Sequence, residues 1–143
     1  MIACDVNVLV YAFRADMPDH DHYARWLTAQ VNSDEAFGVS PLALSGFVRV
    51  VTNPRVFRGR PSTVAKALAF CEQLLGLPHA VLLREGARHW DIFSALCTET
   101  PIKGNLVPAA YFAALAIESG CEWITTDGDF ARFPGLRWRH PLK

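Results

Sequence analysis

The sequence predicts one α/β domain over residues 1–143, a three-layer α/β/α sandwich around a central parallel sheet of four to five strands. Short apolar runs alternate with segments of helical periodicity, which is the element order that parallel sheets produce. The first run is apolar at nearly every position, as expected for a strand covered on both faces. A hydrophobic fraction of 51% in 143 residues allows a sizeable core.

The elements follow from apolar patterning and from residues that start or stop helices. The run from Ile2 to Tyr11 is expected to begin as a continuous apolar strand. Pro41 suits a first helical turn, Asn53-Pro54 ends the helix that it opens, and Gly120 is a typical residue after a helix. The remaining strands are predicted at 36–39, 80–83, 122–126 and 136–139, and helices at 23–31, 41–52, 61–76, 85–99 and 105–119.

Charge and cysteine content narrow the class of protein. Fourteen basic and fourteen acidic residues leave no net charge, so the charge of the whole chain gives no indication of binding to nucleic acid or to a membrane. A neutral chain can still carry a local basic patch. Four widely separated cysteines favour a reducing compartment over a secreted disulfide framework. The opening apolar run contains Asp5, has no basic leader and is too short to cross a membrane. We therefore expect a cytoplasmic protein without a membrane partner.

Carboxylates follow two of the predicted strands. Asp5 comes after the apolar run 2–4, and Asp127 and Asp129 come after 123–126. Sites in parallel sheets form beyond the carboxyl ends of the strands, where close carboxylates repel each other and attract a cation. Hard oxygen ligands favour Mg²⁺ or Mn²⁺. Asn7 is expected to face the same side and orient a water. Taken alone, Asp5 suits the capping of a loop, and Asp127 and Asp129 suit an ordinary turn, as well as each suits a functional site. An acid at each of two strand exits favours a functional site.

Longer stretches of the chain resemble a known family. Residues 5–12 and 125–130 resemble the two ends of PIN-domain ribonucleases, and residues 47–57, 89–90, 104–107 and 133–138 resemble mycobacterial VapC-type toxins. The resemblance implies a Mg²⁺- or Mn²⁺-dependent endoribonuclease, the toxin of a type II toxin–antitoxin pair, that cleaves structured RNA such as tRNA or rRNA. It also implies a homodimer and a VapB-type antitoxin whose C-terminal segment lies across the active-site groove.

Two positions depart from the family pattern. The resemblance places an acid where this chain has Ala109, and a glutamate of many PIN domains falls at Gly46, a departure that the mycobacterial group tends to share. Three explanations of Ala109 are open: an engineered Asp-to-Ala change, a naturally inactive homologue, or a site that works with fewer acids. With Asp5, Asp127 and Asp129 left as catalytic and metal-binding residues, we expect weak metal binding and little or no nuclease activity.

Other side chains are candidates for contact with RNA or an acidic antitoxin segment. They are Asn7 and the arginines Arg14, Arg49, Arg55, Arg58 and Arg60, for which a plain solvated surface is an equally good interpretation. A catalytically silent scaffold that binds RNA or an antitoxin is the alternative function. An aspartyl-phosphate phosphatase is disfavoured because its second acid is replaced by Asn7 and no suitably placed lysine follows.

Overall fold

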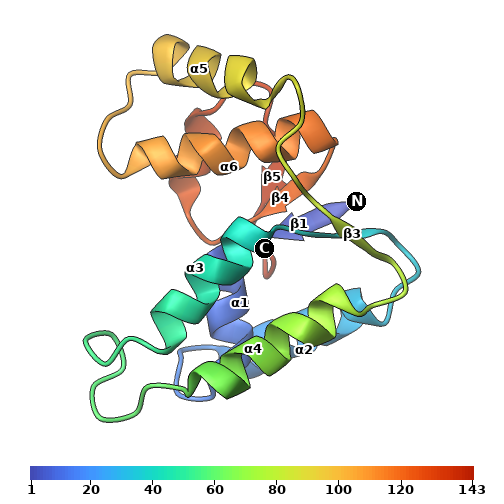
Figure 1. Cartoon of the computed structure of the whole chain (residues 1–143), viewed down its shortest axis with the longest axis vertical. Helices are drawn as coiled ribbons and strands as arrows, with labels where there is room; N and C mark the ends of the chain where they lie inside the picture. The colour runs from blue at the N-terminus through green and yellow to red at the C-terminus, as the bar shows by residue number, and fades with distance from the viewer.

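A five-stranded, wholly parallel sheet forms the middle layer of the computed structural model, which describes residues 1–143 (Figure 1). The sheet order is β3-β2-β1-β4-β5, so the chain order reverses on the two sides of β1. This confirms the predicted parallel sheet. The strands are β1 Ile2–Cys4, β2 Phe37–Val39, β3 Ala80–Leu82, β4 Glu122–Ile124 and β5 Trp138–Arg139.

Six α-helices cover the two faces of the sheet and complete the expected three layers. Four lie on one face, α1 Val6–Phe13, α2 His20–Val31, α3 Pro41–Val51 and α4 Val64–Leu75. The other face carries α5 His89–Glu99 and α6 Leu106–Ser119, which Figure 1 shows above the sheet. A short 3₁₀ helix, η1 Gly128–Arg132, follows β4.

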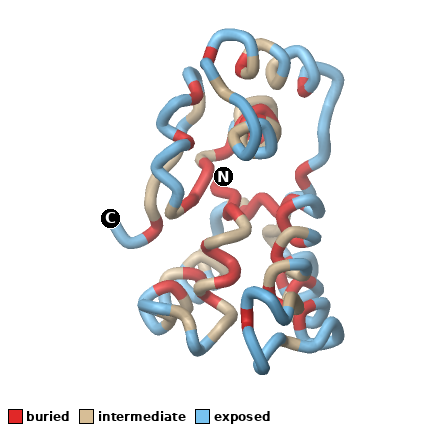
Figure 2. The backbone as a smooth tube through the Cα atoms, turned by 90° about the vertical axis from the view of Figure 1, so that its left-hand side faces the viewer, coloured by how far each residue is buried: buried red, intermediate tan, exposed pale blue.

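The strands divide their side chains between two cores. Ile2 and Cys4 of β1 pack with the four-helix layer, whereas Ala3 packs with α5 and α6. In β4, Ile124 and Trp123 divide in the same way, and both are fully buried. This alternation is the two-residue period of a strand. Figure 2 shows the buried segments concentrated between the layers.

The prediction of a long first strand is wrong beyond Cys4, because the chain turns into α1 at Val6. Asp5 is the cause: it is extended, and its Oδ1 accepts a hydrogen bond of 2.7 Å from the Val6 amide, so it caps the helix. Apart from Asn7 the helix is largely apolar because it packs in the core with its neighbouring helices, and a buried helix and a buried strand look alike by periodicity.

Two helices begin later than predicted. In α4 the Thr63 side chain accepts from the Lys66 amide at 3.2 Å, so the helix starts after Thr63 and not at 61. Before α5, the Glu118 carboxylate accepts from the amides of Gly86 and Arg88 at 2.7 and 2.9 Å. These bonds hold residues 86–88 as a turn, which delays the helix to His89.

The structure contains neither a disulfide bond nor a helix long and apolar enough to cross a membrane. All four cysteines are free, and three of them are buried. None of the helices combines the length and the apolar character that crossing a bilayer requires.

Candidate functional site

Asp5 occupies the junction between β1 and α1, at the carboxyl edge of the sheet. Only 8% of the residue is exposed. Its carboxylate accepts from the Val6 amide at 2.7 Å, from Thr125 Oγ1 at 2.7 Å and from Asn7 Nδ2 at 3.3 Å. Thr125 is in reach because β1 and β4 are paired, with Cys4 opposite Ile124. The first and fourth strands are therefore neighbours, which places the residues that follow them at the same edge of the sheet.

Asn7 lies at this edge, although for a different reason from the one expected. It is in the first turn of α1, not two residues along a strand. Its Nδ2 lies 3.4 Å from Thr125 Oγ1 in addition to the contact with Asp5, and its Oδ1 accepts from the Thr126 amide at 3.3 Å. Asn7 thus ties the start of α1 to the segment after β4.

The two later acids differ in their surroundings. The Asp127 amide donates to Thr125 Oγ1 at 3.0 Å, and Asp127 Oδ1 accepts from the Asp129 amide at 2.9 Å, which starts η1. Thr125 therefore connects Asp5 and Asp127. The Asp129 carboxylate lies 3.4 Å from the Arg132 Nε and is about half exposed, so it is paired along its own 3₁₀ helix.

The position of Asp5 disfavours its negative charge. Burial raises the pKa of the Asp5 carboxyl above its ordinary value, and the neighbouring Asp127 charge raises it further. Hydrogen bonds from Thr125, Val6 and Asn7 act in the opposite direction without cancelling the burial. A cation bound here would favour the ionised form of Asp5.

The acidic side chains around Asp5 offer few ligands for a divalent metal ion. No group of three or more His, Cys, Asp or Glu side chains comes close enough to enclose an ion. Asp5 and Asp127 nevertheless supply two carboxylates close to Thr125, whose hydroxyl donates to the Asp5 carboxylate and accepts from the Asp127 backbone amide. Mg²⁺ commonly binds to one or two carboxylates and keeps several waters. The residues therefore fit an open Mg²⁺ or Mn²⁺ site with few protein ligands, not a closed cage.

The two departures from the family pattern lie on helices of opposite layers. Ala109 is in the first turn of α6 and is half-buried, packed against the core on that side. Gly46 is on α3, where a Cβ atom would lie 2.9 Å from Val6 Cγ2. The side chain of Val6 therefore occupies the space that a Cβ atom at position 46 would need.

Two hollows adjoin at Val6. The larger, about 500 Å³, lies between α3 and α6 and contains none of the three acids. The smaller, about 310 Å³, contains Asp5 and Asn7 and extends along α1 to Val50 of α3. The buried carboxylate of Asp5 lines the smaller hollow, whereas Gly46 and Pro108, the neighbour of Ala109, line the larger one. The larger one is lined by Val6, Leu42, Ser45, Gly46, Arg49, Glu85, Phe93, Val107, Pro108, Tyr111 and Phe112.

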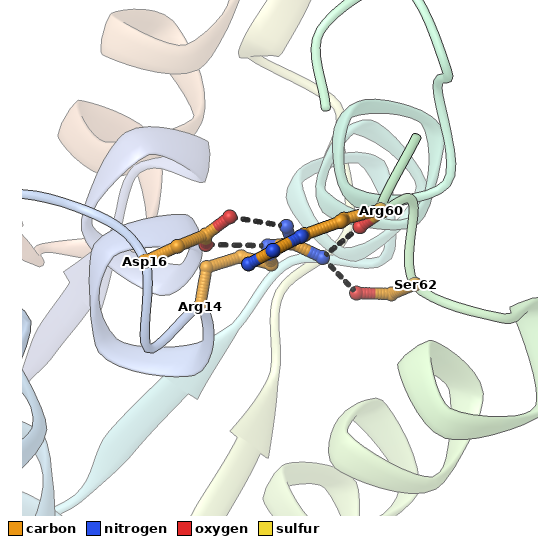
Figure 3. A network of polar contacts seen from close by, with 4 residues as sticks. All are labelled: Arg14, Asp16, Arg60 and Ser62. Carbon is orange, nitrogen blue, oxygen red and sulfur yellow. Dashed lines mark hydrogen bonds and ion pairs between the residues drawn. The ribbon is translucent and has the colours of Figure 1, made fainter. Parts of the chain in front are cut away.

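The arginines predicted to contact RNA or antitoxin occupy three different settings. Arg49 is exposed and lines the larger hollow. Arg55 is exposed in the segment between α3 and α4. The guanidinium of Arg14 is used internally: it pairs with Asp16 and donates to Arg60 O and Ser62 Oγ (Figure 3). The contact roles of these residues stay predictions.

Thr125 was missed by the sequence reasoning. It is fully buried, donates to Asp5 and accepts from the Asp127 amide. The available signal was a polar residue, Thr125, inside the apolar run that leads to Asp127. A buried hydroxyl needs a hydrogen-bond partner, so a threonine in this apolar run indicated a contact with a nearby polar group.

Comparison with known proteins identifies the family of this chain. The family model described as the PIN domain matches residues 2–136. The chain therefore belongs to the PIN-domain family. A VapC ribonuclease of Mycobacterium bovis is 45% identical over 142 residues, covering 99% of this chain and 96% of the relative. Ribonuclease VapC25 of Mycobacterium tuberculosis is 38% identical over 141 residues, with 99% of each chain covered. Within the family the chain thus falls in the VapC group of toxin ribonucleases.

Solved structures show the same fold. VapBC2 from Rickettsia felis, bound to a DNA fragment from its promoter, matches with a TM-score of 0.70 at 19% identity and covers 98% of each chain. VapC20 of Mycobacterium tuberculosis, described as a sarcin-ricin loop cleaving toxin, matches with a TM-score of 0.65 at 18% identity, over 96% of this chain and 99% of that one.

Proposed function

We propose that this chain has the site of a metal-dependent endoribonuclease toxin and that Ala109 leaves the site impaired. The observation that carries the proposal is the placement of Asp5 and Asp127 where β1 and β4 end, with Thr125 bonded to the Asp5 carboxylate and to the Asp127 backbone amide. Membership of the VapC group supports RNA as the substrate. A structured RNA such as tRNA or rRNA is the substrate class we propose, and the similarity to VapC20, described as a sarcin-ricin loop cleaving toxin, supports it.

Asp5 and Asp127 would hold the metal, Mg²⁺ or Mn²⁺, and Asp129 would join them on release from Arg132. When bound, the metal would supply an activated water and stabilise negative charge on the phosphate. The chain itself contributes a rigid frame: Thr125 and Asn7 fix the orientation of the Asp5 carboxylate through hydrogen bonds. Because Asp5 is buried, these bonds also exclude water from one side of the carboxylate.

The Ala109→Asp variant tests this proposal. An added carboxylate at position 109 should attract the metal, while the cost to the helix is small, about 0.5 kcal/mol, since aspartate is a modest helix former that favours a first turn. We expect Mg²⁺- or Mn²⁺-dependent cleavage of tRNA or rRNA to rise at least tenfold over the parent chain. We also expect a larger rise in melting temperature on addition of Mn²⁺.

The matched control is Ala109→Asn, which has nearly the same shape as aspartate and no charge. It should leave both cleavage and the Mn²⁺-induced rise in melting temperature at the parent level. Two results would refute the impairment: parent and Ala109→Asp cleaving RNA equally fast, or Ala109→Asn and Ala109→Asp gaining activity alike.

A catalytically silent scaffold is the second candidate function, and Ala109 itself is the observation that favours it. The two candidates make opposite predictions for Ala109→Asp. Continued inactivity of that variant, together with unchanged Mn²⁺ binding, would favour the scaffold. A gain of metal-dependent cleavage would favour the toxin.

A VapB-type antitoxin is the proposed protein partner. The VapBC complexes among the matching structures support it, and so does the larger hollow, whose apolar lining between α3 and α6 suits a bound peptide segment. Co-expression with a VapB-type antitoxin should give a stable complex, and Leu42→Glu in the lining of the hollow should weaken it. We also propose a homodimer, which light scattering of the purified chain would test.

A further inference from the structure

One segment of this chain has a net positive charge, although the chain as a whole is neutral. Residues 36–71 contain no aspartate or glutamate. The same segment contains five basic residues, Arg49, Arg55, Arg58, Arg60 and Lys66. It forms β2, α3, the connection to α4, and most of α4. This segment is therefore positive and the remainder of the chain is negative, a difference that the net charge of the whole chain conceals.

Three of these arginines lie close together in the connection between α3 and α4, residues 53–62, which we call the arginine loop. Arg55, Arg58 and Arg60 are all exposed. None of them takes part in an ion pair. The nearby carboxylate of Asp16 is already held by Arg14. The loop thus presents three guanidinium groups that have no bound acid to displace.

The arginine loop is held in one conformation by its own backbone. Asn53 Oδ1 accepts from the Arg55 amide at 2.9 Å, and the Asn53 carbonyl accepts from the Phe57 amide at 3.0 Å. The Ser62 amide donates to the Val51 carbonyl at 2.8 Å, which closes the loop at its base. Phe57 is only 7% exposed, so the middle of the loop is anchored in the core.

Arg14 adds a second anchor from the end of α1. Its guanidinium lies 3.9 Å from the centre of the Phe57 ring. Its Nη1 donates to the Arg60 carbonyl at 2.7 Å and to Ser62 Oγ at 3.0 Å, as Figure 3 shows. Asp16 holds the other side of the guanidinium fork. Arg14 therefore fixes the backbone of the loop and leaves the Arg60 side chain exposed.

The arginine loop and the carboxylates lie at opposite ends of α1. Asp5 caps the start of this helix and Arg14 caps its end, and eight helical residues span about 12 Å. The smaller hollow begins at Asp5 and extends to Val50, which lies three residues before Asn53. A strand of RNA in that hollow would run from the acids towards the loop.

We propose that the arginine loop is a preformed element that binds RNA phosphates a few nucleotides from the carboxylates, with Arg14 as its positioning residue. This inference rests on the proposed function for its choice of RNA. Arginine matches phosphate through a planar fork of donors, and a preordered loop loses little entropy on binding. An acidic peptide is the weaker candidate, because the hollow suited to a peptide lies on the other side of Val6.

The proposal is tested by measuring how fluorescein-labelled total bacterial tRNA binds to the full chain. Fluorescence anisotropy reports the binding between 50 and 200 mM KCl, and EDTA is present so that no RNA is cleaved. The test variant replaces the three loop arginines, Arg55, Arg58 and Arg60, by glutamine. The control variant makes the same charge change at exposed sites elsewhere, Arg25, Arg84 and Lys143. We expect the loop variant to bind at least tenfold more weakly at 100 mM KCl, and the control less than threefold.

The dependence on salt gives a second readout. Loss of three phosphate contacts should lower the slope of log affinity against log salt by about 2 to 3. The control should keep the parent slope, and both variants should melt within a few degrees of the parent. Equal weakening of both variants, or an unchanged slope in the loop variant, would overturn the proposal. Loss of binding to a decaglutamate peptide with tRNA binding intact would instead assign the loop to an acidic partner.

Arg14→Lys tests the positioning role at constant charge. Lysine cannot reproduce the fork that contacts Asp16, Arg60 and Ser62, so tRNA binding should fall about threefold or more in the parent chain. In the chain that already has three glutamines in the loop, the same change should have no effect. Equal losses in both chains would show that Arg14 acts only on the fold. Because cleavage is not measured, an inactive Ala109→Asp variant would refute the proposed nuclease without altering these results.

Discussion

The contact between Gly46 and Val6 gives the sharpest test of how the site is packed. A Cβ atom on residue 46 would lie 2.9 Å from Val6 Cγ2, closer than such atoms normally approach. Val6 is β-branched and lies in the first turn of α1, so its side chain has essentially one rotamer and cannot easily rotate away. The Gly46→Ala substitution should therefore push α3 away from α1 beside Asp5.

The expected magnitude comes from two opposing effects. Alanine is better than glycine within a helix by about 1 kcal/mol. Overpacking by one methyl group in a rigid contact costs about 1–3 kcal/mol. Gly46→Ala should thus lower the free energy of unfolding by up to about 2 kcal/mol in the parent. In a Val6→Ala background, where the obstructing methyl groups are absent, the same substitution should raise it by about 1 kcal/mol.

Urea unfolding of the four proteins, parent, both single variants and the double variant, measures this coupling directly. Ser45→Ala on the same helix is the control, because residue 45 is exposed and its substitution should have the same effect in both backgrounds. Equal stabilisation by Gly46→Ala with and without Val6 would refute the steric argument. A coupling of 1 kcal/mol or more would mean that a glutamate at position 46 requires a smaller residue at position 6.

Three further predictions concern the buried carboxylate and the turn before α5. Thr125→Val removes the donor at 2.7 Å from Asp5, and urea unfolding at pH 7.5 should show a loss of about 1–3 kcal/mol; no loss would contradict the bridging role. Because the pKa of Asp5 is raised, the native chain keeps a proton that the unfolded chain releases near pH 4, so this group makes stability fall as pH rises from about 4 towards the raised pKa. Asp5→Asn should remove that decline, and an unchanged stability–pH curve would count against it. Glu118→Gln should speed hydrogen exchange at the Gly86 and Arg88 amides, as measured by NMR, while exchange within α6 stays slow.

Sequence alone was sufficient for the architecture and for the position of the acids along it. Alternating apolar runs and helical segments give a parallel sheet, and in such a sheet residues that follow neighbouring strands meet at one edge. The convergence of Asp5 and Asp127 depended on the first and fourth strands being neighbours, and the structure shows that β1 pairs with β4. The resemblance to PIN-domain ribonucleases also followed from stretches of sequence, and the comparisons confirm the family.

Only the tertiary structure decided what surrounds those acids. The run 6–13 is apolar enough for a strand or a buried helix, and the cap formed by Asp5 selects the helix. Thr125 became a bridge, and Arg14 a support for the arginine loop, through contacts between residues 46 to 120 positions apart in the chain. Local patterns carry no information on such contacts, because they depend on which elements pack together. The sequence thus determined where the carboxylates are along the chain, and the packing determined the raised pKa of Asp5, the partners of the carboxylates and the surface next to them.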